Sequence, residues 1–148
     1  MIMSVSIQLG PGTEGNGLAS MLAELLRQNL DAKPHKLPDF YALRGDFAIV
    51  AEDADIALTM RFAFGHLCIL DGIVGVPSVT IRATSDVVMA LSNMPVGTLG
   101  LPIPENDEQR EVLKQVVSAF RARSFQIFGG IVHFGMLQRL ARVLSVNG

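Results

Sequence analysis

Cysteine and tryptophan are almost missing from this chain of 148 residues, which has one cysteine, Cys68, and no tryptophan. A single cysteine cannot form a disulfide within the chain, and it excludes a metal site made of several thiolates. The first residues contain no basic stretch followed by a long apolar one, so no secretory signal is expected. We therefore expect a protein of the reducing cytoplasm.

Charged residues are also scarce, at 18% of the chain against roughly 25% in typical domains. With 12 basic and 14 acidic residues the net charge is -2, which argues against nucleic acid as a partner. No apolar run approaches the length of a membrane-spanning helix, about 20 residues. Yet 49% of the residues are hydrophobic and the mean hydropathy is +0.39. This surplus must pack in a core, face a partner or line a cavity.

The order of local patterns predicts an α+β fold. Apolar residues at helical spacing predict a helix from 18 to 30, capped by Asn16, and four strands joined by short turns follow. Strands that follow one another favour an antiparallel meander with helices on one face. We interpret residues 1–17 as a flexible N-terminal arm and 18–148 as a single domain. The remaining predicted segments are strands 47–50, 55–64, 67–70, 78–83 and 124–128, and helices 85–91, 107–123 and 134–144.

The segment 55–64 has the clearest strand pattern in the chain. Its larger apolar side chains alternate with residues such as Thr59 and Arg61, so the two sets face opposite sides of a sheet. We predict that the apolar set points at the helices and that the opposite face meets water. This apolar set is Leu58, Met60, Phe62 and Phe64.

The sequence contains only weak matches to nucleotide-binding, metal-binding and catalytic motifs. Gly10, Gly12 and Gly15 have the spacing of a dinucleotide-binding loop, but the next strand ending in an acid lies about 40 residues on, where the motif requires about 20. The three histidines have no second metal ligand nearby, and Cys68 lies in mid-strand between apolar residues. The residues therefore predict no metal, no cofactor and no catalytic group. A nucleotide-using enzyme stays open as a third hypothesis.

The apolar surplus is rich in methionine and phenylalanine, which form broad and adaptable walls. The segment 127–137 is apolar throughout, apart from His133. It is too short to span a bilayer. Two interpretations stay open for it, the mouth of an apolar cavity and transient contact with a membrane surface.

Three stretches of the sequence resemble the sterol carrier protein type two family. Residues 43–50 and 55–69 resemble its paired strands and tight glycine turn, and 77–91 resembles its strand-to-helix junction. Residues 123–130, followed by the last helix, resemble its closing strand and final helix. The region around 43–45 and 53–56 is similar to a bacterial subgroup of lipid-binding accessory factors in isoprenoid-quinone biosynthesis. The resemblance covers roughly 43–144, about two-thirds of the chain.

The resemblance implies a five-stranded, mainly antiparallel sheet with helices over one face and an apolar tunnel between them. It implies non-catalytic binding or transport of a hydrophobic lipid, such as a sterol, a fatty acyl chain or an isoprenoid. A role as interaction subunit of a quinone-biosynthetic complex, or as a homodimer, stays open beside it. The wall residues that it implies are Met60, Phe62, Met89, Phe120, Phe125, Ile127, Phe134, Leu137 and Leu140.

Overall fold

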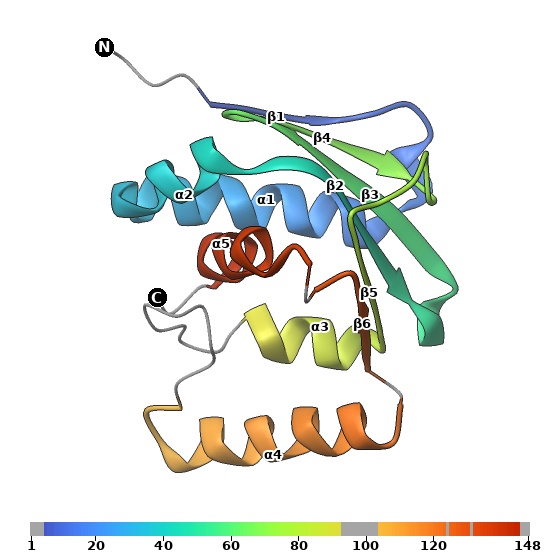
Figure 1. Cartoon of the computed structure of the whole chain (residues 1–148), viewed down its shortest axis with the longest axis vertical. Helices are drawn as coiled ribbons and strands as arrows, with labels where there is room; N and C mark the ends of the chain where they lie inside the picture. Colours follow the sequence, from blue (N-terminus) through green and yellow to red (C-terminus); the bar gives the residue numbers. More distant parts are fainter. Residues whose placement is uncertain (1–4, 93–103, 124, 131, 146–148) are drawn as a thin grey trace.

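The computed structural model describes residues 5–92, 104–123, 125–130 and 132–145, without the side chains at 89, 91 and 92. The described strands form one mixed sheet of six strands in the order β1-β4-β3-β2-β5-β6, and helices cover one of its faces (Figure 1). The strands are β1 (Ser6–Leu9), β2 (Arg44–Ala51), β3 (Ile56–Ala63), β4 (His66–Asp71), β5 (Val79–Ala83) and β6 (Gln126–Phe128). The α-helices are α1 (Gly17–Ala32), α2 (Leu37–Ala42), α3 (Ser85–Ser92), α4 (Asp107–Arg121) and α5 (Phe134–Leu144). Short 3-10 helices are η1 (Thr13–Gly15), η2 (Pro34–Lys36) and η3 (Glu52–Ala54).

The predicted α+β class and one-sided helix layer are confirmed, but the predicted meander is only partly correct. Strands β2, β3 and β4 pair antiparallel in sequence order, whereas β5 pairs in parallel with β2 and not with β4. After β4 the chain crosses the outer face of the sheet. Val74 donates its N–H to the Thr59 hydroxyl at 3.0 Å, and Ser78 donates to the Asp46 carbonyl at 2.8 Å. This crossing delivers the chain to the far edge of β2, where β5 begins.

The sixth strand, β1, comes from the segment expected to be a flexible arm. Residues Ser6–Leu9 pair in parallel with β4, so the sheet has one strand more than the five expected. The following residues are held by hydrogen bonds: the Thr13 hydroxyl donates to the Gly10 carbonyl at 2.7 Å. The Asn16 amide donates to the Ala57 carbonyl at 3.0 Å, while its oxygen accepts from Ala19 as the cap of α1. The glycines here lie in the ordered connection between β1 and α1.

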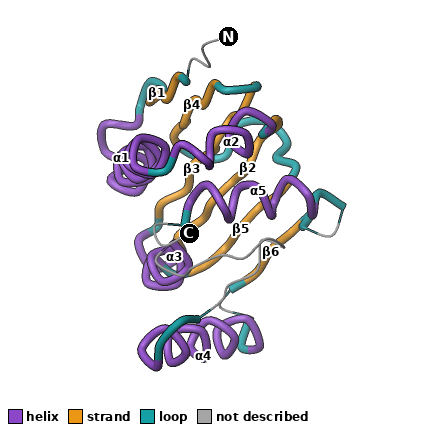
Figure 2. The backbone as a smooth tube through the Cα atoms, turned by 90° about the vertical axis from the view of Figure 1, so that its left-hand side faces the viewer, coloured by secondary structure: helices purple, strands orange, loops and turns teal. Residues whose placement is uncertain are grey.

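The main hydrophobic core lies between the sheet and helices α1, α2 and α5 (Figure 2). Leu58, Met60 and Phe62 of β3 are buried in it, as the alternation predicts. Phe64 is instead 58% exposed because the strand ends before it and the turn gives it a φ of 46°. Thr59, on the opposite face, is fully buried rather than solvated, because the crossing segment covers it and bonds its hydroxyl.

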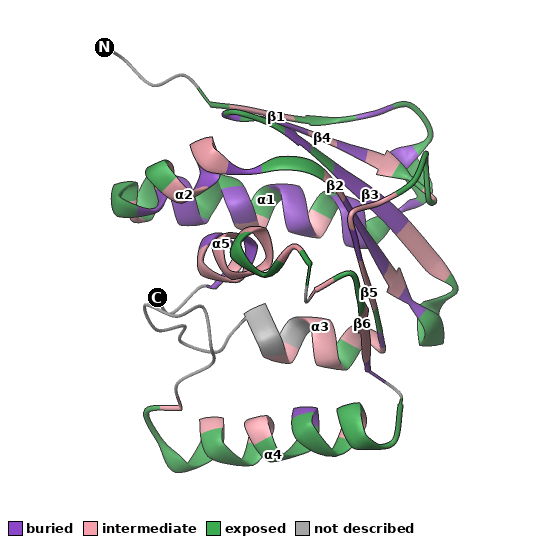
Figure 3. Cartoon of the chain, in the orientation of Figure 1, coloured by how far each residue is buried: buried purple, intermediate pink, exposed green. Residues whose placement is uncertain are grey.

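A second, smaller cluster joins α3 and α4 to the β5–β6 end of the sheet. Its buried residues are Ala83, Val116 and Phe125. Helix α3 begins against η3, where the Asp53 carboxylate accepts hydrogen bonds from the Ser85 N–H and hydroxyl at 2.7 and 3.1 Å. Helix α4 lies at one end of the molecule and is mostly exposed (Figure 3).

Candidate functional site

Helix α5 is the element on which the predicted lipid site depends, and its C-terminal end is strongly held. The last carbonyls of a helix have no partner within the helix. Here the Asn29 side-chain amide donates to the carbonyls of Val143 and Leu144 at 3.0 and 3.1 Å. The Lys36 ammonium donates to the carbonyl of Arg142 at 2.7 Å and to that of Ser145. Groups from α1 and η2 therefore cap α5 across the fold.

A cluster of charges adds to this attachment. The Asp39 carboxylate of α2 accepts hydrogen bonds from Arg139 at 3.1 Å and from Arg142 at 3.0 Å. The three side chains are only partly exposed, so solvent screens them less than a surface pair. Helix α2 and the C-terminal half of α5 are thereby joined by charge-assisted hydrogen bonds.

Burial lowers the pKa of Lys36 to about 8, from the usual 10.5, because the ammonium loses hydration inside the fold. The positive charge of Lys33 lowers it further, and the negative charge of Asp39 opposes both effects. Lys36 is 3% exposed, an unusual environment for a lysine. Because its ammonium lies on helix carbonyls, the arrangement is that of a capping group.

The structure brings together five of the nine predicted wall residues. Met60, Phe62 and Leu140 are buried in the main core, and Ile127 and Leu137 pack against it from β6 and α5. The Phe62 ring makes edge-on contacts with two other phenylalanine rings, at centroid distances of 5.9 and 5.6 Å. These five residues belong to one apolar layer between the sheet and the helices, which other core residues complete.

Three of the other four predicted wall residues lie apart from this layer. Phe125 is buried in the second cluster, and Phe120, whose ring centroid is 5.8 Å away, is 56% exposed. Phe134, at the start of α5, is 49% exposed. Met89 belongs to α3, but its side chain lies outside the described residues. Ile127 packs against both clusters and so connects the two groups.

The glycines before and in α5 differ in their surroundings. A Cβ on Gly129, which has a φ of 80°, would lie 2.2 Å from the Ser78 carbonyl oxygen. A Cβ on Gly130 would lie 2.9 Å from Ile127 and 3.2 Å from Leu137, so the backbone there packs tightly on the apolar layer. Gly135 has nothing within 4 Å of its Cβ position. The tight approach is thus at the β6 end, and the first turn of α5 has open space beside it.

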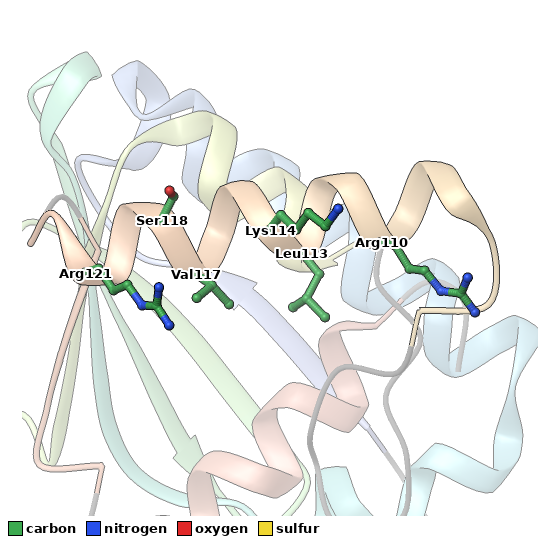
Figure 4. A pocket seen from close by; sticks show the side chains of 6 residues that line it. All are labelled: Arg110, Leu113, Lys114, Val117, Ser118 and Arg121. Carbon is green, nitrogen blue, oxygen red and sulfur yellow. The ribbon is translucent and has the colours of Figure 1, made fainter.

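Two of the open grooves in the described part of the molecule are of similar size, and neither of these two lies between the sheet and α5. One, of about 420 Å³, lies beside the β2–β3 hairpin and Arg82. The other, of about 470 Å³, follows α4 (Figure 4) and is lined by Arg110, Leu113, Lys114, Val117, Ser118 and Arg121. Sequence reasoning did not select these α4 residues, although their helical spacing on one side of the segment is a signal for a shared face.

Three further observations bear on other kinds of site. Among the described residues, no three His, Cys, Asp or Glu side chains come together in a way that fits a metal ion. No helix in the ranges that the structure describes is long and apolar enough to cross a bilayer. Cys68 is half-buried in β4, next to Arg61 of β3 across the sheet.

No family model matches the chain, and no curated protein sequence matches it. Among solved structures, the fold is similar to a protein described as "UbiJ-SCP2 Ubiquinone synthesis protein". The TM-score is 0.55, the sequence identity is 14%, and the similarity covers 85% of this chain and 90% of that one. The fold is therefore SCP2-like, as the sequence resemblance implies, with one more strand than expected.

Proposed function

We propose that this chain binds a hydrophobic lipid beneath α5, without acting on it chemically, as an accessory factor of isoprenoid-quinone biosynthesis in the cytoplasm. The observation that carries the proposal is the SCP2-like fold, which extends over 85% of the chain and is similar to a protein of ubiquinone synthesis. The apolar layer under α5 gives the proposal its location. A partner enzyme of the same biosynthesis would receive or supply the lipid.

The chemistry of the layer suits an apolar ligand with few polar groups. Met60, Phe62, Ile127, Leu137 and Leu140 present only carbon and one thioether sulfur. Burial of apolar ligand surface contributes roughly 25 cal/mol per Å², so a long chain binds without hydrogen bonds. The thioether and the aromatic ring adapt to chains of different shape. Such a site selects by length and shape and has little selectivity for a head group.

Entry of a ligand requires the N-terminal half of α5 to move. Its C-terminal half is held by Asn29, Lys36 and Asp39, whereas its first turn has open space beside Gly135 and an exposed Phe134. Lifting this turn separates Leu137 from Ile127 and opens the layer toward the second cluster. In this proposal Phe125, Phe134 and Met89 contact the part of the ligand that extends toward α3 and α4.

Displacement of a fluorescent fatty acid by an isoprenoid quinone tests the proposal. Wild type should bind the probe and release it to the quinone, and Leu137→Arg should lose binding because it places a cation in the apolar layer. Val76→Arg is the matched control, since Val76 is 92% exposed on the crossing segment. Circular dichroism confirms that both variants fold. Absence of probe uptake by wild type, or equal binding by folded Leu137→Arg, would overturn the proposal in favour of an interaction subunit without a lipid site.

A further inference from the structure

Helix α4 has a wider apolar face than the fold covers. Val116 is buried against the second cluster, and Val112 and Ala119 are partly buried beside it. The apolar face continues around the helix, where Val117 is 42% and Phe120 is 56% exposed. Leu113 lies between them and is partly buried. Large apolar side chains that stay exposed along one helix face mark an interaction surface when they adjoin one another.

Basic residues border this exposed apolar strip on one side. At about 100° per residue, Arg110, Lys114 and Arg121 follow directly after Leu113 and Val117 around the helix. All five line the open groove along α4 (Figure 4). The acidic residues of the helix, Asp107, Glu108 and Glu111, lie farther around, beyond the basic stripe.

The basic stripe is largely free to meet an external anion. The Arg110 guanidinium lies 3.4 Å from the Asp107 carboxylate, but both side chains are exposed, and such a pair is weak. Lys114 and Arg121 have no acidic partner among the residues that the structure describes. The chain as a whole carries a net charge of -2, so attraction to an anionic surface has to come from a local basic surface such as this stripe.

We propose that α4 docks on an anionic lipid bilayer, with Val117 and Phe120 at the acyl boundary and Lys114 and Arg121 on the lipid phosphates. A strip of apolar side chains bordered by lysine and arginine is the arrangement of helices that lie in a membrane interface. The 15-residue helix is about 22 Å long, so it lies on the surface and does not span it. Its place at one end of the molecule leaves it accessible (Figures 1 and 2).

The same residues argue against a second copy as the occupant. A two-fold contact between antiparallel α4 helices would bring the basic stripes of both copies together, where they repel each other. The exposed strip of three apolar side chains is also smaller than the well-packed area of a stable protein interface. A bilayer avoids both problems. Its phosphates attract the basic stripe, and its acyl region accepts a few apolar side chains without a complementary pocket.

Co-sedimentation with vesicles tests the docking surface on the full chain. Wild type should bind vesicles of phosphatidylglycerol and phosphatidylcholine, should bind pure phosphatidylcholine much more weakly, and should be released at high salt. Lys114→Gln with Arg121→Gln should weaken binding roughly 30-fold, since each cation at an anionic surface contributes about one factor of five. Arg27→Gln with Arg44→Gln removes the same charge at exposed positions outside α4 and should change binding little.

A second variant tests the apolar strip. Val117→Asn removes an exposed apolar side chain without touching the buried Val116, and it should reduce vesicle binding while the melting temperature stays unchanged. Equal binding to neutral and anionic vesicles, or full binding by the double variant, would overturn the proposal. So would concentration-dependent dimers that Val117→Asn abolishes, because α4 would then contact a second copy. The fatty-acid probe separates this docking from the proposed function, since the α4 variants should still take it up.

Discussion

At the residue scale, Lys36 is the side chain whose position its local sequence explains least. It follows Pro34 and His35 in a short polar connection, where a lysine is expected to be solvated. The structure buries it, with its ammonium on the carbonyls of Arg142 and Ser145. The Lys36 ammonium therefore loses its contacts with water and caps a helix that is more than 100 residues away in the sequence.

The Lys36 site predicts a specific pH dependence of stability. The pKa of Lys36 is about 8 in the folded chain and 10.5 as the ordinary value, so the folded chain releases its proton first. Between these values the unfolded chain binds more protons, and the free energy of unfolding rises with pH. Below pH 8 Lys36 is protonated in both the folded and the unfolded chain. The cost of burying its charge then lowers the free energy of unfolding by a constant amount.

Urea unfolding of wild type and Lys36→Met across this range measures the effect. As the pH rises from 8 toward 10.5, the free energy of unfolding of wild type should increase relative to that of Lys36→Met. Subtraction of the variant removes the titration of all other groups. Parallel curves would mean that Lys36 keeps an ordinary pKa and is not desolvated.

At the element scale, the start of α5 combines a tight junction with a loose first turn. Gly129→Ala should lower the free energy of unfolding by about 2 kcal/mol or more, because φ is positive and the new Cβ meets the Ser78 carbonyl. Gly135→Ala should raise it by about 0.5–1 kcal/mol, because alanine favours the helix and the space is open. Urea unfolding at one pH gives both values.

The two glycine substitutions are matched controls for one another, since each adds one methyl group within the same segment. Destabilisation by Gly135→Ala would contradict the open space beside the first turn of α5. It would also remove the basis for placing the moving part of the lipid site there. A neutral Gly129→Ala would show that the β6–α5 junction is not held against Ser78.

At the scale of the whole molecule, the two hydrophobic clusters differ in size. Helix α1 buries seven of its residues, whereas Val116 is the buried residue of α4 within the described ranges. We expect the amide hydrogens of α4 to exchange more readily than those of α1. The opening that exposes the α4 amides should cost at least about 2 kcal/mol less free energy. Native-state hydrogen exchange checks this. Equal protection of both helices would show that the molecule opens as one unit and that α4 is more firmly packed than its contacts indicate.

The sequence by itself determined the features that depend on neighbouring residues. Helical spacing and the Asn16 cap predicted α1, and strict alternation predicted the buried face of β3 from Leu58 to Phe62. Because the predicted strands followed one another and did not alternate with helices, the α+β class and the helix layer on one face were predicted as well. These features repeat with the period of the backbone, so a short window of sequence contains them.

Only the tertiary structure decided which distant segments meet. Strand β5 pairs with β2, and β1 joins the edge of β4, because the chain after β4 crosses the outer face and the glycine-rich segment folds back on the sheet. The predicted wall divides between two clusters for the same reason, with Phe125 on one side of Ile127 and Phe62 on the other. The capping of α5 by Lys36 and the exposure of Phe64 also depend on where α2 begins and where β3 ends in space. Which distant segments pair, and which residues they bury, depends on how the whole chain folds back on itself. The periodicity of a single segment therefore does not reveal it.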